Sequence, residues 1–148
     1  MNPTRRKIRA QVYATVGIHF NELVRNSAFT VGQIQYHIHR LINDGELNYG
    51  EFHGQTHYYP PEYDKRDQIV VALLRRETSY KIVRYLSEHK SSTPSEITDE
   101  LVIARGTLEY HLDRLIESDL VEKQYDDKAR VILRLEDPEE ITELIAII

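Results

Sequence analysis

The chain repeats one segment, and the repeat limits the folds that it can adopt. The stretch VGQIQYHIHRLINDGEL begins at Val31, and the stretch ARGTLEYHLDRLIESDLV begins at Ala104. A shift of 74 positions, which places Gly32 on Gly106, aligns matching residues throughout the two stretches. The matches include Tyr36 with Tyr110, His37 with His111, Arg40 with Arg114 and Leu41 with Leu115. A repeat of this length indicates one supersecondary unit that is used twice.

The composition is typical of a globular protein without disulfide bonds. The 148 residues suffice for two small domains, and 41% of them are hydrophobic and 29% charged. The absence of cysteine excludes a disulfide framework and a thiolate metal site. No apolar run approaches a membrane span, and the N-terminal MNPTRRKIRA lacks the apolar stretch of a secretory signal. We therefore expect a cytoplasmic protein that makes no membrane contact.

The net charge of −5 is divided unevenly along the chain. Residues 1–65 carry seven Lys and Arg against six Asp and Glu, whereas residues 66–148 carry twelve against eighteen. Five of the seven histidines also lie in the first half. The acidic excess thus belongs to the second half, so the first half is the better candidate for binding an anionic partner.

Each copy of the repeat has the pattern of three helices followed by a β-hairpin. In the first copy we expect helices over residues 4–16, 20–26 and 31–43, the last capped by Thr30. The stretch ELNYGEFHGQTHYYPP then alternates apolar and polar residues around a His-Gly tip, which predicts two strands. In the second copy we expect helices over 82–89, 94–101 and 105–118, and two strands around Asp126 and Asp127.

The fold class that this order predicts is α+β and mostly helical, with two tandem winged helix-turn-helix domains. Such a domain consists of three helices plus a β-hairpin, and its third helix enters the DNA major groove. We predict a first winged helix domain at 1–63, a connecting helix at 64–78, a second winged helix domain at 79–137 and a C-terminal helix at 138–148. The apolar stripe of that last helix needs a surface to pack against.

The third helix of the first copy separates an apolar stripe from a polar, aromatic and basic face. At 100° per residue, Ile34, Ile38 and Leu41 fall on one side, and Tyr36 and Arg40 fall on the other. Glutamine can pair with adenine, arginine with guanine or phosphate, and tyrosine with phosphate or a thymine methyl group. In the second copy the outward residues include carboxylates, which would oppose phosphates.

The candidate DNA-binding residues lie on these outward faces, at the basic start of the chain and on the first hairpin. In the first copy they are Arg5, Arg6, Thr30, Gln33, Gln35, Tyr36, His39, Arg40, His53 and Gln55, and in the second they are Arg105, Thr107, Tyr110 and Arg114. The basic start could instead be a solvated helix end, and the outward tyrosines could be ordinary surface residues.

The two aligned histidines, His37 and His111, fall beside the apolar stripe. We interpret them as half-buried residues that orient the third helix. His37 and His39 point to different sides of one helix, so they cannot chelate one metal ion, whereas His53 and His57 could approach each other across the hairpin. Nothing supplies further ligands, and we expect no metal and no cofactor.

The motifs GQIQYHIHRL, THYYPPEYD, ALLRRET and ARGTLEYHLDRL together resemble archaeal transcriptional regulators with two winged helix-turn-helix units in one chain. The segment GTLEYHLDRLIESDLV is also similar to the recognition helix of ArsR- and MarR-type regulators. The resemblance spans about residue 4 to about residue 136. It implies a cytoplasmic DNA-binding regulator that is often dimeric. Because the chain lacks the cysteines of ArsR-type metal sensors, metal sensing is not implied.

The sequence favours a sequence-specific regulator of transcription that binds double-stranded DNA and reads the major groove with its first winged helix. The alternative is a tandem winged-helix adaptor that binds protein without specific DNA binding, with the acidic second domain as its docking surface. We expect no enzyme, because the chain has no cysteine nucleophile, no phosphate-binding glycine loop and no HExxH motif. We expect a homodimer, because symmetric dimers read two half-sites about 34 Å apart. The operator, the effector, the direction of regulation and the number of units on DNA stay open.

Overall fold

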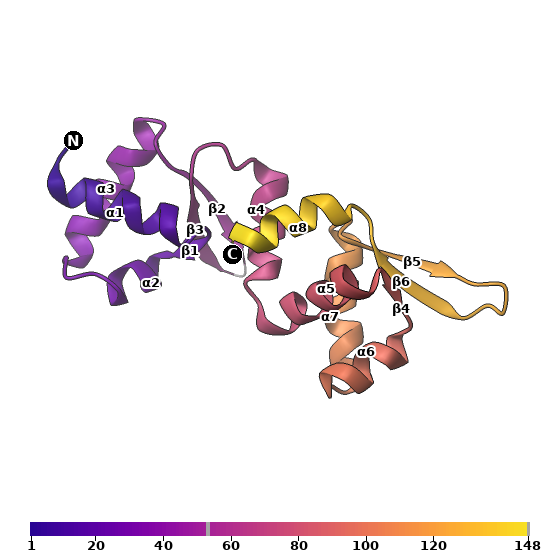
Figure 1. Ribbon diagram of the computed structural model, residues 1–148. Coiled ribbons are helices and arrows are strands. Elements are labelled where there is room, and N and C mark those ends of the chain that lie inside the picture. The colour runs from indigo at the N-terminus through magenta and orange to yellow at the C-terminus, as the bar shows by residue number, and fades with distance from the viewer. Residues whose placement is uncertain (53, 148) are drawn as a thin grey trace. The chain divides into compact units, whose positions relative to one another are not determined.

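The computed structural model describes residues 1–52 and 54–147. Internal contacts divide the chain into two compact units, Met1–Ala72 and Leu73–Ile148, which we call unit 1 and unit 2. Each unit contains three helices followed by a hairpin, as Figure 1 shows from indigo to yellow. The division falls within helix α4 (Lys65–Leu74), inside the segment that the sequence predicts as a connection.

Unit 1 has the predicted winged helix order and one additional short strand. The hairpin strands pair antiparallel from Asn48 opposite Tyr59 to Phe52 opposite Gln55. A third strand joins the open edge of the second hairpin strand, where Ile18 lies opposite Tyr58. The elements are α1 (Pro3–Ala14), β1 (Ile18–His19), α2 (Phe20–Arg25), α3 (Val31–Asn43), β2 (Asn48–Phe52) and β3 (Gln55–Tyr59).

The core of unit 1 forms where the apolar stripes of its helices meet the inner face of the sheet. Ile8 and Val12 of α1 are at most 1% exposed and pack in one cluster with residues of α3. The other members of this cluster are Ile18, Leu23, Ile34, Ile38, Leu41, Leu47 and Tyr58. Burial of each such side chain contributes about 1.5–3 kcal/mol to stability. The stripe that the sequence predicts for α3 is therefore the side that holds the helix in the fold.

A second contact fixes the hairpin of unit 1 against the first part of α4. The Tyr59 hydroxyl donates to the Gln68 backbone carbonyl at 3.3 Å, and Gln68 Nε2 donates to the Tyr63 carbonyl at 3.1 Å. A Cβ atom at Gly50 on β2 would overlap Gln68 Oε1. The side chain of Gln68, which is 5% exposed, thus packs closely against a strand that has no side chain there.

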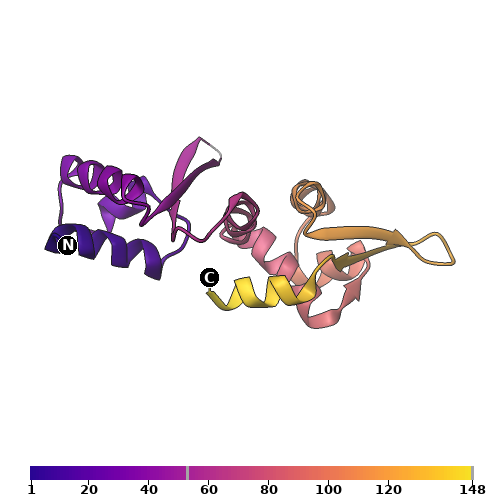
Figure 2. The same ribbon diagram turned by 90° about the horizontal axis from the view of Figure 1, so that it is seen from above.

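Unit 2 repeats the order and adds a C-terminal helix. Its sheet has the strand order β4-β6-β5, in which Ser92 of the short strand lies opposite Leu133. The orange hairpin β5–β6 extends beyond the helices of its unit (Figure 2). The elements are α5 (Glu77–His89), β4 (Ser91–Ser92), α6 (Pro94–Leu101), α7 (Arg105–Glu117), β5 (Val121–Tyr125), β6 (Val131–Leu135) and α8 (Pro138–Ile147).

The C-terminal helix α8 finds its packing surface within unit 2. Ile141 and Leu144 are buried, and α8 packs against α5. Helix α5 itself begins at Glu77, five positions before the start at Ile82 that its apolar pattern predicts. The predicted connecting segment 64–78 therefore contains the whole of α4 and the first two residues of α5. No helix among the residues that the structure describes is long and apolar enough to span a membrane.

Candidate nucleic-acid interface

A reciprocal capping box fixes the start of α3. The Thr30 hydroxyl accepts a hydrogen bond from the Gln33 backbone at 3.1 Å, and Gln33 Oε1 accepts one from the Thr30 backbone at 2.9 Å. Such a pair satisfies two backbone donors that a helix start otherwise leaves free. It also turns the Gln33 carboxamide back toward the helix start, which opposes a bidentate contact with adenine. The DNA contact of Gln33 stays a prediction, and its side-chain oxygen already accepts the capping bond.

Four exposed side chains form the outer face of α3: Gln35, Tyr36, His39 and Arg40. Arg40 Nη1 donates to the Tyr36 hydroxyl at 3.1 Å, and Tyr36 is 54% exposed. On the opposite side, no residue of the buried apolar stripe is more than 3% exposed. The outward phase that the helical wheel predicts is confirmed for Tyr36, His39 and Arg40, and Gln33, which the wheel also places outward, is exposed too. No carboxylate belongs to this face.

Arg5 has a structural contact that the sequence does not reveal. Arg5 Nε donates to His37 Nδ1 at 3.2 Å, which ties α1 to α3. His37 is only 7% exposed, and burial lowers its pKa, as do the positive charges of Arg5 and Arg40. The neutral imidazole that accepts this bond carries its proton on Nε2. Arg5 is therefore anchored in the fold, whereas the exposed Arg6 donates to the Met1 carbonyl at 3.3 Å.

The hairpin of unit 1 contributes polar and aromatic side chains beside α3. Gln55 is exposed at the start of β3, and His53 lies outside the described residues. Tyr49 on β2 is 51% exposed, and the sequence analysis did not select it. The alternation of the predicted strand places Tyr49 on the outward side, so its exposure was within reach of the pattern. His57 Nδ1 lies 2.7 Å from the Gly17 carbonyl oxygen, which links β3 to the turn before β1.

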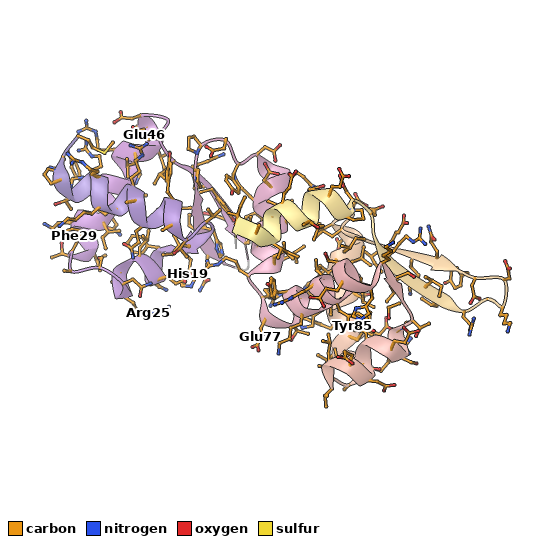
Figure 3. The ribbon with its side chains drawn as sticks, viewed as in Figure 1. His19, Arg25, Phe29, Glu46, Glu77 and Tyr85 are labelled. Carbon is orange, nitrogen blue, oxygen red and sulfur yellow. The ribbon has the colours of Figure 1, made fainter. Side chains whose placement is uncertain are left out.

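The helix α2 that supports α3 has its own cap. The His19 ring accepts a hydrogen bond from the Glu22 backbone at 3.2 Å, and the Glu22 carboxylate accepts one from the His19 backbone. Figure 3 labels His19 at the start of α2 and Arg25 at its end. Phe29, in the connection to α3, packs against the core of unit 1. These contacts fix the angle at which α3 leaves the rest of the unit.

The corresponding helix of unit 2, α7, keeps the tyrosine and arginine but surrounds them with acids. Arg114 lies over the Tyr110 ring, with its guanidinium carbon 3.7 Å from the ring centroid. Arg105 Nε pairs with Glu109 Oε1 at 2.8 Å, so one of the predicted DNA-binding cations is already neutralised. Thr107, the remaining predicted contact, is exposed, as are Asp113 and Glu117.

Aligned positions of the two helices show how the faces differ. Gln35 corresponds to Glu109, His39 to Asp113 and Asn43 to Glu117. At each of these positions a carboxylate in α7 replaces an amide or an imidazole in α3. Phosphate attracts cations and neutral donors and repels carboxylates, so α3 presents the more favourable face to a nucleic acid.

The contact of the buried histidine recurs in unit 2. The Ser79 hydroxyl lies 3.1 Å from His111 Nδ1 and joins α5 to α7. Burial lowers the pKa of His111, and the charges of Arg76 and Arg114 add to that effect. Both aligned histidines thus serve as contacts between the first and third helices. Within residues 1–52 and 54–147, no group of three or more histidine, cysteine or acidic side chains could hold a metal ion.

Comparison with known proteins assigns a helix-turn-helix domain to each unit. Residues 2–71 match a family model described as an N-terminal HTH domain, and residues 73–124 match one described as a helix-turn-helix domain. The chain therefore carries two tandem helix-turn-helix domains.

Two individual proteins are also similar. The uncharacterized HTH-type transcriptional regulator MJ1398 of Methanocaldococcus jannaschii is 28% identical over 115 residues. That match covers 78% of this chain but only 29% of the relative, so the chain spans less than a third of its length. Among solved structures, HlyU from Vibrio cholerae N16961 matches with a TM-score of 0.49 and 17% identity, over 55% of this chain and 86% of that chain.

Proposed function

We propose that this chain, built from two helix-turn-helix domains, is a transcriptional regulator that binds specific sequences of double-stranded DNA. Unit 1 is the reader, and its helix α3 enters the major groove. The observation that carries this proposal is the outer face of α3: four exposed side chains, none of them acidic, stand opposite the buried stripe that anchors the helix.

The chemistry of the outer face suits base edges and phosphates together. Gln35 presents a free carboxamide, the group that pairs bidentately with adenine. Arg40 can bind guanine or a phosphate, and its bond to the Tyr36 hydroxyl at 3.1 Å restricts its orientation before DNA arrives. His39 donates to either kind of acceptor. Arg6 and the exposed Gln55 of the hairpin add contacts on either side of the helix.

Three of the predicted contacts have a supporting role in this proposal. Thr30 and Gln33 hold the start of α3 through their capping box, and Arg5 holds its middle through His37. Their loss would weaken DNA binding by displacing α3 and not by removing a direct contact. His53, at the hairpin tip, remains a proposed phosphate contact on sequence grounds alone.

Unit 2 favours a different kind of partner. Its third helix carries Glu109, Asp113 and Glu117 beside the stacked pair Tyr110 and Arg114. An acidic face with an aromatic centre suits a basic protein surface better than a phosphate backbone. We infer that the main role of unit 2 is to dock a protein and that any DNA contact of its third helix is secondary. The residues predicted for that contact are Arg105, Thr107, Tyr110 and Arg114. If both units docked proteins, the chain would be a protein-interaction adaptor, the alternative that its negative net charge favours.

A homodimer completes the proposal, because two copies of α3 would read two half-sites about one helical turn apart. Exposed apolar residues are available for self-association. Ile147 on α8 is 52% exposed, and Tyr13 on α1 is 37% exposed. Light scattering at micromolar protein should give twice the chain mass of 17.4 kDa. A monomer at that concentration would contradict the dimer and leave the reader assignment intact.

The experiment that tests the reader assignment compares charge reversals at aligned positions. Fluorescence anisotropy measures binding of the full chain to DNA from upstream of its own gene and to random DNA at physiological salt. We expect preference for the first DNA, loss of binding in Arg40→Glu, and little change in Arg114→Glu. Equal affinity for both DNAs would contradict sequence-specific recognition. Unchanged DNA binding in both variants would instead support the adaptor.

A further inference from the structure

A hollow lies beside the outer face of α3. It lies within unit 1, where α3, the start of α2 and the hairpin strands β2 and β3 meet, and its volume is about 560 Å³. Small-molecule sites typically occupy about 300–1,000 Å³. Ile38 and Tyr58, which are 3% and 7% exposed, line the hollow together with Phe20. Its walls are thus supplied by the rigid core of the unit.

The lining of this hollow is uncharged. Among residues 1–52 and 54–147, no Asp, Glu, Lys or Arg contributes to it, and its polar groups include the amides of Gln35 and Asn43, the imidazole of His39 and the hydroxyl of Thr56. Among the described residues, the side chains of Gln35, His39 and Asn43 have no hydrogen-bond partner. An ionised ligand would lose its hydration here without an opposing charge, which is costly. Apolar and aromatic walls, together with the neutral donors and acceptors of Gln35, His39 and Asn43, fit an uncharged aromatic molecule.

We propose that the hollow of unit 1 binds a neutral, flat aromatic molecule of one or two rings, and that this molecule regulates DNA binding. The regulatory part rests on the proposed DNA-reading function. Gln35 and His39 belong both to the rim of the hollow and to the outer face of α3. A ligand that takes the hydrogen bonds of these two side chains removes them from base edges, so ligand and DNA compete.

Unit 2 provides an internal contrast. The three polar positions of α3 that line the hollow carry Glu109, Asp113 and Glu117 in α7. Three carboxylates at the rim would repel one another and disfavour an uncharged aromatic ligand there. The two units therefore share the winged helix framework but differ at these rim positions, which are neutral in unit 1 and acidic in unit 2.

The binding test is an NMR titration of the ¹⁵N-labelled full chain with three neutral probes: indole, p-cresol and benzamide. Benzoate serves as the charged control. We expect saturable shifts at the amides of Ile38, Ile42 and Thr56 with at least one neutral probe, and none with benzoate. No saturable shift with any of the three probes would overturn the proposal, as would saturable shifts confined to unit 2. If these amides shift when the protein concentration rises without any probe, the hollow is occupied by a second copy. That result would also overturn the proposal.

A filling substitution links the shifts to the hollow. Thr56→Phe projects a ring from β3 into the space, and we expect it to raise the dissociation constant of the probe at least about tenfold. Thr142→Phe, at an exposed position on α8 in unit 2, is the matched control and should leave the dissociation constant of the probe unchanged. Equal affinity in the wild type and in Thr56→Phe would contradict the assignment. Both variants are first checked for wild-type amide spectra away from the substitution. Thr56→Ser is measured beside them as the conservative change at the same position.

The regulatory part is tested separately by anisotropy with DNA at saturating probe. We expect the apparent affinity for DNA to fall at least about fivefold in the wild type and to stay unchanged in Thr56→Phe. If the probe binds and DNA affinity does not change, the regulatory part fails while the binding site stands. If the chain binds no DNA at all, the proposed function fails, and the titration still decides the site.

Discussion

Arg5 Nε lies 3.2 Å from His37 Nδ1, and this hydrogen bond joins the first helix of unit 1 to its third. The repeat preserves the contact with a different side chain, because the hydroxyl of the aligned residue Ser79 lies 3.1 Å from His111 Nδ1. A histidine that is nearly excluded from water needs a partner for its ring nitrogen, since an unsatisfied buried polar group is costly. In both units the partner comes from the first helix, so this contact joins the first helix of each unit to its third.

Replacement of Arg5 by alanine should raise the pKa of His37. The positive charge of Arg5 is one cause of the lowered value, and burial, the larger cause, remains in the variant. NMR titration of the His37 ring protons in wild type and Arg5→Ala measures the change. Lys7→Ala, a neighbouring exposed cation, is the control. An unchanged His37 titration in Arg5→Ala would show that the two side chains do not interact in solution.

Acidification should destabilise both units. The lowered pKa values of His37 and His111 mean that the unfolded chain binds protons at these sites more readily than the folded chain. Their contribution to stability is therefore complete at neutral pH and is lost as pH falls below the ordinary histidine value of 6.5. Urea unfolding at pH 7.5, 6.5 and 5.5 measures this loss. The double variant His37→Gln and His111→Gln should show a shallower dependence, and an equal slope would contradict the assignment.

Gly50→Ala should destabilise unit 1 by about 1–3 kcal/mol, because the new Cβ atom overlaps Gln68 Oε1 in a closely packed contact. The matched control is Gly32→Ala on the exposed side of α3, where a Cβ atom meets nothing within 4 Å. Alanine there should stabilise the chain by up to about 1 kcal/mol, since glycine is a poor helix former. Thermal unfolding of both variants checks the pair. Equal effects would show that the contact of Gly50 with Gln68 carries no packing constraint.

Arg40→Ala should reduce the salt dependence of DNA binding by about one unit of slope if Arg40 binds a phosphate. If Arg40 binds guanine instead, the variant should lose discrimination at one position by about 1–3 kcal/mol with a nearly unchanged slope. Anisotropy at several salt concentrations, on matched and single-base variant DNA, separates the two. If Arg40→Ala binds DNA with wild-type affinity, salt dependence and base discrimination, Arg40 does not belong to the interface.

The main elements were predictable because they leave local signals. The apolar spacing of α3, the Thr30 cap and the alternation of the hairpin each depend on neighbouring residues, and these elements lie where the sequence predicts them. The outer face of α3 followed from the same periodicity. Its exposure needed no knowledge of the rest of the fold beyond the position of the apolar stripe.

The features that were missed depend on distant residues. Strands β1 and β4 have two residues each, too few for an alternating pattern, and they exist because β3 and β6 offer an open edge. The start of α5 at Glu77 was missed because its N-cap, Arg76, makes no side-chain capping bond. The contact of Arg5 with His37 joins residues 32 positions apart. A helical wheel gives the outward direction of Gln33 but not the capping bond that its side-chain oxygen accepts.

The most direct test of the reader assignment exchanges the two outer faces. The double variant Gln35→Glu and His39→Asp gives α3 the acids of α7, and Glu109→Gln with Asp113→His makes the reverse change. All four positions are on helix surfaces, so both variants should keep the folded spectrum. Anisotropy should show that the first variant loses DNA binding at physiological salt and that the second keeps or improves it. Full DNA affinity in the first variant would contradict the account, because the surface that defines the reader would then have no part in reading.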